Sequence, residues 1–258
     1  MMPIELKEVL SFANDLADIA RPIALQHFRS PLSIDLKGDS SPVTIADRTI
    51  ETRLRERIAE RYPDHGVFGE EFAQQRGLEY TWVLDPIDGT RAFISGVPLF
   101  GTLIALAKGD TPIAGVVDMP AMGERWVGSS LGAFFQGRPA EVSGCTTLSN
   151  ARVSSTSPDI FTADALAAFD RLTKRAAFRR FGGDCYSYGL LASGHCDLVI
   201  EQGLKPYDYM ALVPIIEAAG GFITDWAGEP LTFGSDGKVI AAATRELLEE
   251  CLIELRGG

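Results

Sequence analysis

The sequence has few basic residues for its length, and few histidines. Its 258 residues contain 24 lysines and arginines against 35 aspartates and glutamates, with 3 histidines, which gives a formal net charge of −11. Phosphate backbones and anionic lipid headgroups are normally bound by clustered basic side chains. The acidic balance therefore argues against nucleic acids and membrane surfaces as partners.

Long apolar runs and paired cysteine motifs are missing as well. Charged residues, glycine and proline interrupt every apolar stretch before the roughly 18–20 residues that a membrane span needs, and no basic segment precedes an apolar run at the N-terminus. The 4 cysteines form no CxxC pair, which argues against a zinc ribbon or a thioredoxin-like motif. We therefore expect a cytoplasmic globular protein with reduced cysteines.

The spacing of apolar residues predicts helices and strands along the whole chain. A helix is expected over 4–28 and a second from Thr44 or Asp47 to Tyr62. Short strands are expected over 66–69 and 81–84, and an antiparallel, sheet-rich middle over 101–107, 113–117, 126–128 and 133–138. After Asn150, strands over 151–155, 177–181 and 197–201 alternate with helices over 163–173, 186–193 and 209–219. This alternation predicts a layered α/β (α+β) fold, with a weak compositional boundary dividing it into 1–145 and 146–258.

The segment WVLDPIDGTR at 82–91 carries the strongest chemical signal. An apolar strand delivers Asp85 and Asp88 to a predicted turn, in which Pro86 fixes one φ and Gly89 permits close approach of the backbone. Carboxylates at a strand end suit a hard divalent cation such as Mg²⁺. The structural alternative is an Asx-turn followed by a helix, with Asp88 as the N-cap.

Two further acidic sites accompany this segment. Glu70 and Glu71 follow a short predicted strand and would lie near the same sheet edge, although an isolated pair of this kind is usually a solvated loop. Asp208 stands at the N-terminus of the apolar helix predicted over 209–219, where helix capping is the structural alternative.

Together, GEE at 69–71, DPIDGT at 85–90 and YDYMAL at 207–212, followed by EAAGG at 217–221, resemble the inositol monophosphatase family of magnesium-dependent, lithium-sensitive phosphomonoesterases. The order and separation of these motifs match the family across most of the chain. The resemblance implies a hydrolase with a sugar-phosphatase-like α-β-α-β-α sandwich. It also implies a homodimer and two or three Mg²⁺ ions in each active site.

The resemblance assigns roles residue by residue. The positions that match the family's metal ligands are Glu70, Asp85, the Ile87 carbonyl, Asp88 and Asp208. Asp47 and Thr90 match the pair that orients the attacking water, and Glu70 helps to activate that water through a bound metal. The amides of Gly89 and Thr90, at a predicted helix start, suit the phosphate group.

The substrate is suggested by residues outside the metal motifs. The continuation RAFISG at 91–96 looks like the histidinol-phosphatase branch of the family. Alignment on Asp208 places Asp184 and Glu201 where the family contacts the alcohol part of the substrate. Two carboxylates there suit the ammonium and imidazole groups of histidinol phosphate. The predicted substrate-binding set is Asp88, Gly89, Thr90, Arg91, Asp184, Glu201 and Asp208.

Several alternatives stay open at this point. Asp184 could instead cap the helix that begins near Tyr186, and Arg91 could be a surface charge. The expected activity is hydrolysis of histidinol phosphate to histidinol and phosphate, a step of histidine biosynthesis. The same site could act on inositol phosphate, a sugar phosphate or a 3′-phosphonucleotide. A catalytically silent binding or regulatory protein would be expected to have lost a ligand, and all the motif residues are present.

Overall fold

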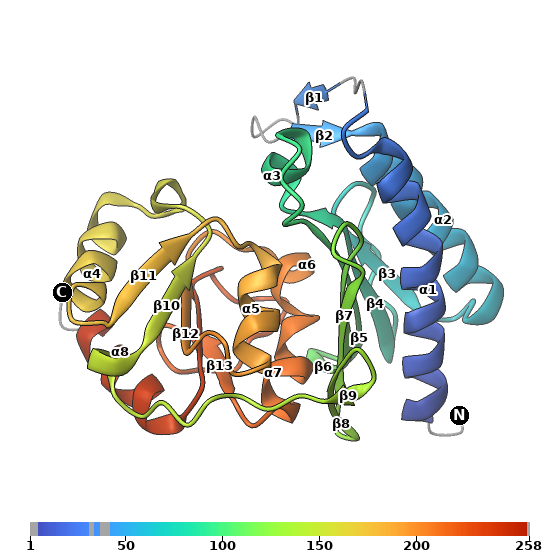
Figure 1. The fold of residues 1–258 in the computed structure, drawn as a ribbon. Coiled ribbons are helices and arrows are strands. Elements are labelled where there is room, and N and C mark those ends of the chain that lie inside the picture. The colour runs from blue at the N-terminus through green and yellow to red at the C-terminus, as the bar shows by residue number, and fades with distance from the viewer. Residues whose placement is uncertain (1–4, 31–33, 37–41, 257–258) are drawn as a thin grey trace.

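The computed structural model describes residues 5–30, 34–36 and 42–256, which form five alternating layers of helix and sheet (Figure 1). Helices α1 and α2 cover the outer face of a seven-stranded sheet, and α5, α6 and α7 lie between this sheet and a five-stranded one. Helices α4 and α8 cover the far face of the second sheet. The predicted α-β-α-β-α sandwich is confirmed.

The seven-stranded sheet follows the order of its strands along the chain. Its strands are β3 (Gly66–Gly69), β4 (Tyr80–Asp88), β5 (Gly101–Lys108), β6 (Thr111–Met119), β7 (Glu124–Ser129), β8 (Gly132–Phe135) and β9 (Arg138–Pro139). Neighbours pair antiparallel from β4 to β9, whereas β3 and β4 run parallel. The antiparallel middle of the chain is thus confirmed.

The five-stranded sheet has a mixed topology. In spatial order its strands are β11 (Phe178–Phe181), β10 (Arg152–Ser155), β12 (Leu198–Glu201), β14 (Val239–Ala242) and β13 (Phe222–Asp225). The first three run parallel to one another, and β14 is antiparallel to both of its neighbours. A two-stranded ribbon, β1 (Ile34–Leu36) with β2 (Pro42–Thr44), completes the strands of the described residues. The predicted boundary between residues 145 and 146 falls between the two larger sheets, and the division into two units stays a prediction.

The helices agree with the sequence pattern except near the end of the chain. They are α1 (Leu6–His27), α2 (Ile45–Arg61), α3 (Thr90–Ile94), α4 (Ala163–Thr173), α5 (Cys185–Ala192), α6 (Pro206–Tyr209), α7 (Leu212–Ala218) and α8 (Arg245–Arg256). The single helix predicted over 209–219 is wrong, because a turn at Met210 and Ala211 separates α6 from α7. Pro214 lacks the N–H that would bond to the Met210 carbonyl, so a continuous helix is not favoured there. Within the described ranges, no helix has the length and apolar character needed to cross a membrane.

Each interface between layers buries its own apolar cluster. Leu16 of α1 and Ile50 of α2 pack with Trp82 of β4 on the outer face of the first sheet. Between the sheets, Trp126 of β7 packs with Tyr209 in a second cluster, and a third lies beneath α4 and α8. Burial of apolar surface on both faces of each sheet therefore stabilises the layered order.

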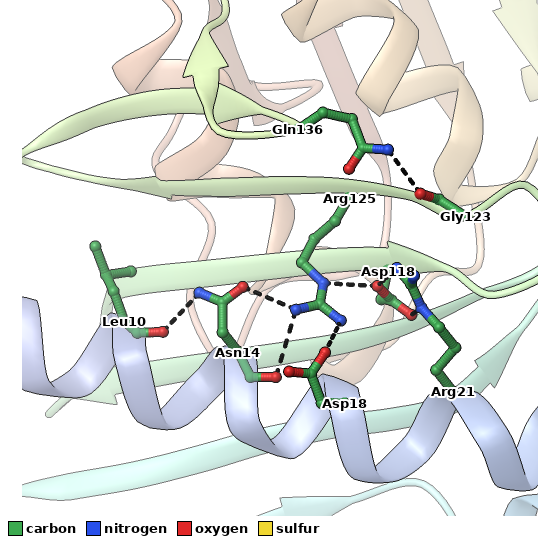
Figure 2. Close-up of polar contacts among 8 residues, drawn as sticks. All are labelled: Leu10, Asn14, Asp18, Arg21, Asp118, Gly123, Arg125 and Gln136. Carbon is green, nitrogen blue, oxygen red and sulfur yellow. Dashed lines mark hydrogen bonds and ion pairs between the residues drawn. The ribbon is translucent and has the colours of Figure 1, made fainter.

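A buried carboxylate ties α1 to the first sheet (Figure 2). Asp118 of β6 accepts hydrogen bonds from Arg21 Nε at 3.0 Å and Arg125 Nε at 2.7 Å. Arg125 also donates to Asp18 at 2.6 Å and to the Asn14 side chain at 3.0 Å. We call these five residues the Asp118 cluster. Its two acids, Asp18 and Asp118, are balanced by two guanidinium groups of the protein itself.

Candidate active site

Strand β4 carries the two aspartates of the DPIDGT segment. In a regular strand, residues three apart point to opposite faces of the sheet. Here the register between β4 and β5 shifts between Asp85 and Asp88, and this irregularity brings both carboxylates to one side. The strand predicted to end at Leu84 therefore continues to Asp88, and the aspartates stand in a bulged strand end rather than in a turn.

Three carboxylates converge at this strand end. One oxygen from each of Asp85, Asp88 and Asp208 lies within 4.8 Å of the others. We call these three residues the carboxylate cluster. Backbone amides orient all three: Asp85 accepts from Ile87 N at 3.0 Å, Asp88 from Cys185 N at 2.7 Å and Asp208 from Lys205 N at 2.6 Å. The capping alternative for Asp88 at α3 is wrong, because its partner is the first residue of α5. Asp208 does serve α6 as a cap while it faces the other two acids.

Glu70 comes to the same place from β3. Strand β3 runs parallel to β4 with Gly69 opposite Leu84, so that the next residues on each strand, Glu70 and Asp85, are neighbours. The negative charge of Glu70 contributes to raising the pKa of Asp85. The structure therefore brings the first and second acidic motifs of the sequence together.

The electrostatics of this cluster favour a bound cation. Desolvation, followed by the charges of neighbouring acids, raises the pKa of Asp85 and of Asp208 well above the usual range for aspartate. The pKa of Asp88 is also raised, mainly by desolvation, although the hydrogen bonds from Cys185 oppose the change. Carboxylates this close do not all ionise without a positive partner. An all-oxygen donor set fits a hard divalent ion such as Mg²⁺.

Asp47 lies beside the cluster at the start of α2. Its Oδ2 accepts hydrogen bonds from the Thr44 N–H at 2.8 Å and the Thr44 hydroxyl at 2.6 Å, and its Oδ1 is buried without a partner. Desolvation is the largest cause that raises the pKa of Asp47 to about 6, and Glu70 adds to it. The Thr90 hydroxyl donates to the Ile87 carbonyl at 3.1 Å. The roles predicted for Asp47, Ile87 and Thr90 stay predictions.

The turn between β4 and α3 depends on a glycine. Gly89 adopts a left-handed conformation with φ 80°, which a residue with a side chain rarely adopts. A Cβ at this position would also meet the Leu99 carbonyl at 3.0 Å and the Asp184 carboxyl carbon at 3.3 Å. Glycine therefore allows the predicted phosphate-binding amides and Asp184 to approach each other closely.

Asp184 has a strained backbone at the start of α5. Its φ of 44° and ψ of −138° lie in a region that non-glycine residues seldom occupy, and its side chain makes no capping hydrogen bond. The capping alternative for Asp184 is therefore wrong. Desolvation, then the charges of Asp88 and Glu201, raises the pKa of Asp184 to about 8, while Arg91 opposes the change. The predicted substrate residues thus lie close enough to influence one another.

Glu201 is buried at the end of β12. Its Oε1 accepts from the Thr156 N–H at 2.8 Å and the Thr156 hydroxyl at 2.5 Å, and its Oε2 accepts from the Tyr188 hydroxyl at 3.3 Å. Desolvation is the main cause that raises the pKa of Glu201 to about 7. Sequence reasoning missed Thr156 and Tyr188, because one follows a strand and the other sits in an apolar helix, with no motif to mark either.

One cavity joins the two groups of acids. It has a volume of about 120 Å³ and is lined by Asp88 and Asp208 from the carboxylate cluster, by Asp184 at the start of α5 and by Glu201 at the end of β12. Thr156 and Tyr188 also line it. A small phosphate ester placed here would meet acids of both groups.

This geometry agrees with the comparison to known families. The sequence profile described as "Inositol monophosphatase family" matches residues 5–257. The chain belongs to the inositol monophosphatase family. Enzymes of this family are phosphatases that use divalent metals, typically Mg²⁺, and the carboxylate cluster offers the donors for such an ion.

Individual proteins similar to this chain are phosphatases with more specific names. The chain is 42% identical over 243 residues to "Bifunctional phosphatase IMPL2, chloroplastic" of Arabidopsis thaliana, a match that covers 93% of this chain and 70% of that protein. It is 38% identical to a histidinol-phosphatase of Chlorobaculum parvum, with 90% and 91% covered. A solved structure of an inositol monophosphatase from Zymomonas mobilis superposes with a TM-score of 0.90 at 45% identity, covering 98% of this chain and 100% of that one. The resemblance to relatives named histidinol-phosphatase is confirmed.

Proposed function

We propose that this chain is a Mg²⁺-dependent phosphomonoesterase that hydrolyses histidinol phosphate to histidinol and phosphate. The observation that carries the proposal is the second pair of acids, Asp184 and Glu201, in the cavity beside the carboxylate cluster. Both have raised pKa values because desolvation and nearby acids disfavour their charged forms. The ammonium group of histidinol phosphate would add positive charge beside these acids, where Arg91 already opposes the raised pKa of Asp184.

The phosphate end of the substrate would bind at the strand ends of the first sheet. The residues proposed to hold two or three Mg²⁺ ions are Glu70, Asp85, the Ile87 carbonyl, Asp88 and Asp208. Bound Mg²⁺ supplies neutralisation of the phosphoryl oxygens and lowers the pKa of water. The amides of Gly89 and Thr90 would donate to the phosphate, and Arg91 would attract it.

Asp47 and Thr90 would orient the attacking water. The unpartnered Oδ1 of Asp47 is a buried hydrogen-bond acceptor, and its other oxygen is held by Thr44. A buried acceptor without a partner is costly, and a water donating to it would remove that cost. Held in this way, the water would have its lone pair directed at phosphorus.

The names of relatives support the substrate without deciding it. A relative 38% identical is named histidinol-phosphatase, whereas the similar structure from Zymomonas mobilis is described as an inositol monophosphatase. Inositol phosphate is therefore the second candidate substrate. A neutral polyol would add no positive charge to balance Asp184 and Glu201, and only Arg91 would oppose the raised pKa of Asp184.

The test is a comparison of kcat/KM for histidinol phosphate and inositol 1-phosphate in excess Mg²⁺. We expect a preference for histidinol phosphate of about 100-fold, because a site built around a polar group rejects analogues that lack its partner. Equal values, or a preference for inositol 1-phosphate, would contradict the proposed substrate while leaving the phosphatase chemistry in place. Gel filtration with light scattering would test the predicted homodimer.

A further inference from the structure

Glu51 is a buried acid that the proposed mechanism does not use. Its side chain is 0% exposed, although most glutamates lie at the surface. It stands four residues after Asp47 on α2, so that both side chains face the same way. The face of α2 that presents Asp47 to the active site therefore presents Glu51 one turn further along.

The Glu51 carboxylate holds the turn that carries Glu70. Its Oε2 accepts the backbone N–H of Glu71 at 2.7 Å, and its Oε1 accepts Arg55 Nε at 2.7 Å. Arg55 in turn donates from Nη2 to the Ala73 carbonyl at 3.1 Å. The ion pair on α2 thus holds the backbone at two points that follow Glu70, the Glu71 N–H and the Ala73 carbonyl.

Gly69 shows how closely the turn is pressed onto this carboxylate. A Cβ added at Gly69 would lie 2.0 Å from Glu51 Oε1 and 2.4 Å from Glu51 Cδ, where no atom fits. The backbone conformation of Gly69 is one that alanine also adopts, because its φ is not in the left-handed region. A side chain at this position would therefore have to displace either the Glu51 carboxylate or the turn.

We propose that Glu51, fixed by Arg55, is a positioning residue that sets the place of Glu70 beside Asp85 and thereby the affinity of the site for Mg²⁺. A charge-assisted hydrogen bond to the Glu71 amide limits movement of the adjacent peptide, and Glu70 is part of that peptide. Partners that orient metal ligands typically change metal affinity or activity by about 10–100-fold when they are removed. This inference rests on the proposed role of Glu70 as a metal ligand.

The first test compares Glu51→Ala and Glu51→Met with the control Glu56→Ala. Glu56 lies on the same helix and makes an exposed ion pair with Arg53. Calorimetric titration of the full chain with Mg²⁺ should show affinity at least tenfold weaker for Glu51→Ala and within twofold of wild type for the control. At saturating Mg²⁺, kcat should fall more than KM rises, because the substrate contacts are intact.

A purely structural role predicts a different result. Glu51→Ala would then lower the melting temperature and leave Mg²⁺ affinity within twofold of wild type, which would overturn the proposal. If Glu51→Ala does not fold, Glu51→Met decides, because it keeps the length of the side chain and has no oxygen to accept the Glu71 N–H. A folded Glu51→Met with unchanged Mg²⁺ affinity would overturn the proposal equally.

A double-mutant cycle with Gly69→Ala tests the contact itself. Alone, Gly69→Ala should weaken Mg²⁺ binding about tenfold, because the new Cβ displaces the turn from Glu51. In the Glu51→Ala background the same change should have little further effect, since the opposing carboxylate is gone. Additive losses would contradict the inference. A wild-type chain that binds no Mg²⁺ would instead contradict the proposed function.

Discussion

The Asp118 cluster and the carboxylate cluster are two acidic regions on the same sheet, and they differ in what balances their charge. Asp118 accepts from Arg21 and Arg125, and this pairing raises the pKa of Arg21. At the end of β4, three aspartates converge within 4.8 Å, and nearby acids help to raise their pKa values. One region is neutralised by the protein, and the other offers carboxylate donors to a cation.

This difference separates a structural acid from a functional one. A carboxylate held by two arginines fixes α1 against the sheet, and its loss should lower the free energy of unfolding. Carboxylates that repel one another weaken the metal-free fold and become favourable only when a cation binds. The predictions below test this contrast, from the largest expected effect to the smallest.

The largest effect is expected from Asp88→Asn. The amide keeps an oxygen that can accept the Cys185 N–H but removes one of the converging charges. We expect kcat to fall on the order of 10³-fold, as for loss of a group that stabilises developing charge. The melting temperature of the metal-free protein should be unchanged or higher, because repulsion is relieved. Activity retained within tenfold of wild type would contradict the metal assignment.

Asp118→Ala should have the opposite effects, a loss of stability with little change in kcat. Removing this acid leaves two guanidinium groups without their shared partner, and we expect the free energy of unfolding to fall by about 3 kcal/mol. Below the unfolding temperature, kcat should stay within twofold of wild type. Urea unfolding and steady-state kinetics measure the two effects, with Asp15→Ala on the exposed side of α1 as the control. A large loss of kcat in the folded variant would contradict the assignment of Asp118 as a structural acid.

The pH dependence of the metal-free protein sharpens the comparison. The folded-state pKa values of Asp47, Glu201 and Asp184 are raised to about 6, 7 and 8. Between about pH 4 and pH 8 the folded chain therefore binds more protons than the unfolded chain, and stability falls as pH rises. We expect a loss of several kcal/mol between pH 5 and pH 8 in EDTA, because each group stays protonated in the folded chain over about one to three pH units in which it is ionised in the unfolded chain. Stability that is flat or rising over this range would count against the raised values.

Asp184→Ala should produce the smallest effect and the most selective one. We expect kcat/KM for histidinol phosphate to fall about tenfold, the cost of a lost charged contact, while kcat/KM for p-nitrophenyl phosphate changes less than threefold. Asp184→Gly removes the same carboxylate and also relieves the backbone strain at φ 44°. It should match the alanine variant in activity and exceed it in stability by about 1 kcal/mol. Equal losses on both substrates would give Asp184 a structural role.

Local patterns predicted much of the fold. Alternation and turn residues indicated the hairpins of the first sheet, and helical spacing indicated α1, α2 and α4. Strands β13 and β14 were not predicted, although β10, β11 and β12 have the same length of 4 residues and were predicted. Helix α8 was not predicted either, and the break before α7 was missed although Pro214 was visible as its signal. The place of β14 between β12 and β13 is set by strand pairing, which no local pattern encodes.

Only those residues of the candidate site that lie in recognisable sequence motifs could be predicted. Resemblance pointed to Asp85, Asp88 and Asp208, and the structure brings these three together. The bulge that turns both β4 aspartates to one side depends on pairing with β5, which no local pattern encodes. Glu51 looked like one more polar residue on an amphipathic helix. Its importance appears only where α2 packs against the turn after β3.

The most direct test of the account is the Mg²⁺ dependence of phosphate release from histidinol phosphate by the wild-type chain. Mutual repulsion in the carboxylate cluster predicts a rate that rises with Mg²⁺ to saturation, disappears in excess EDTA and returns when Mg²⁺ is added back. Phosphate release that persists undiminished in EDTA, or no release at any Mg²⁺ concentration, would contradict the central claim that these acids form a catalytic metal site.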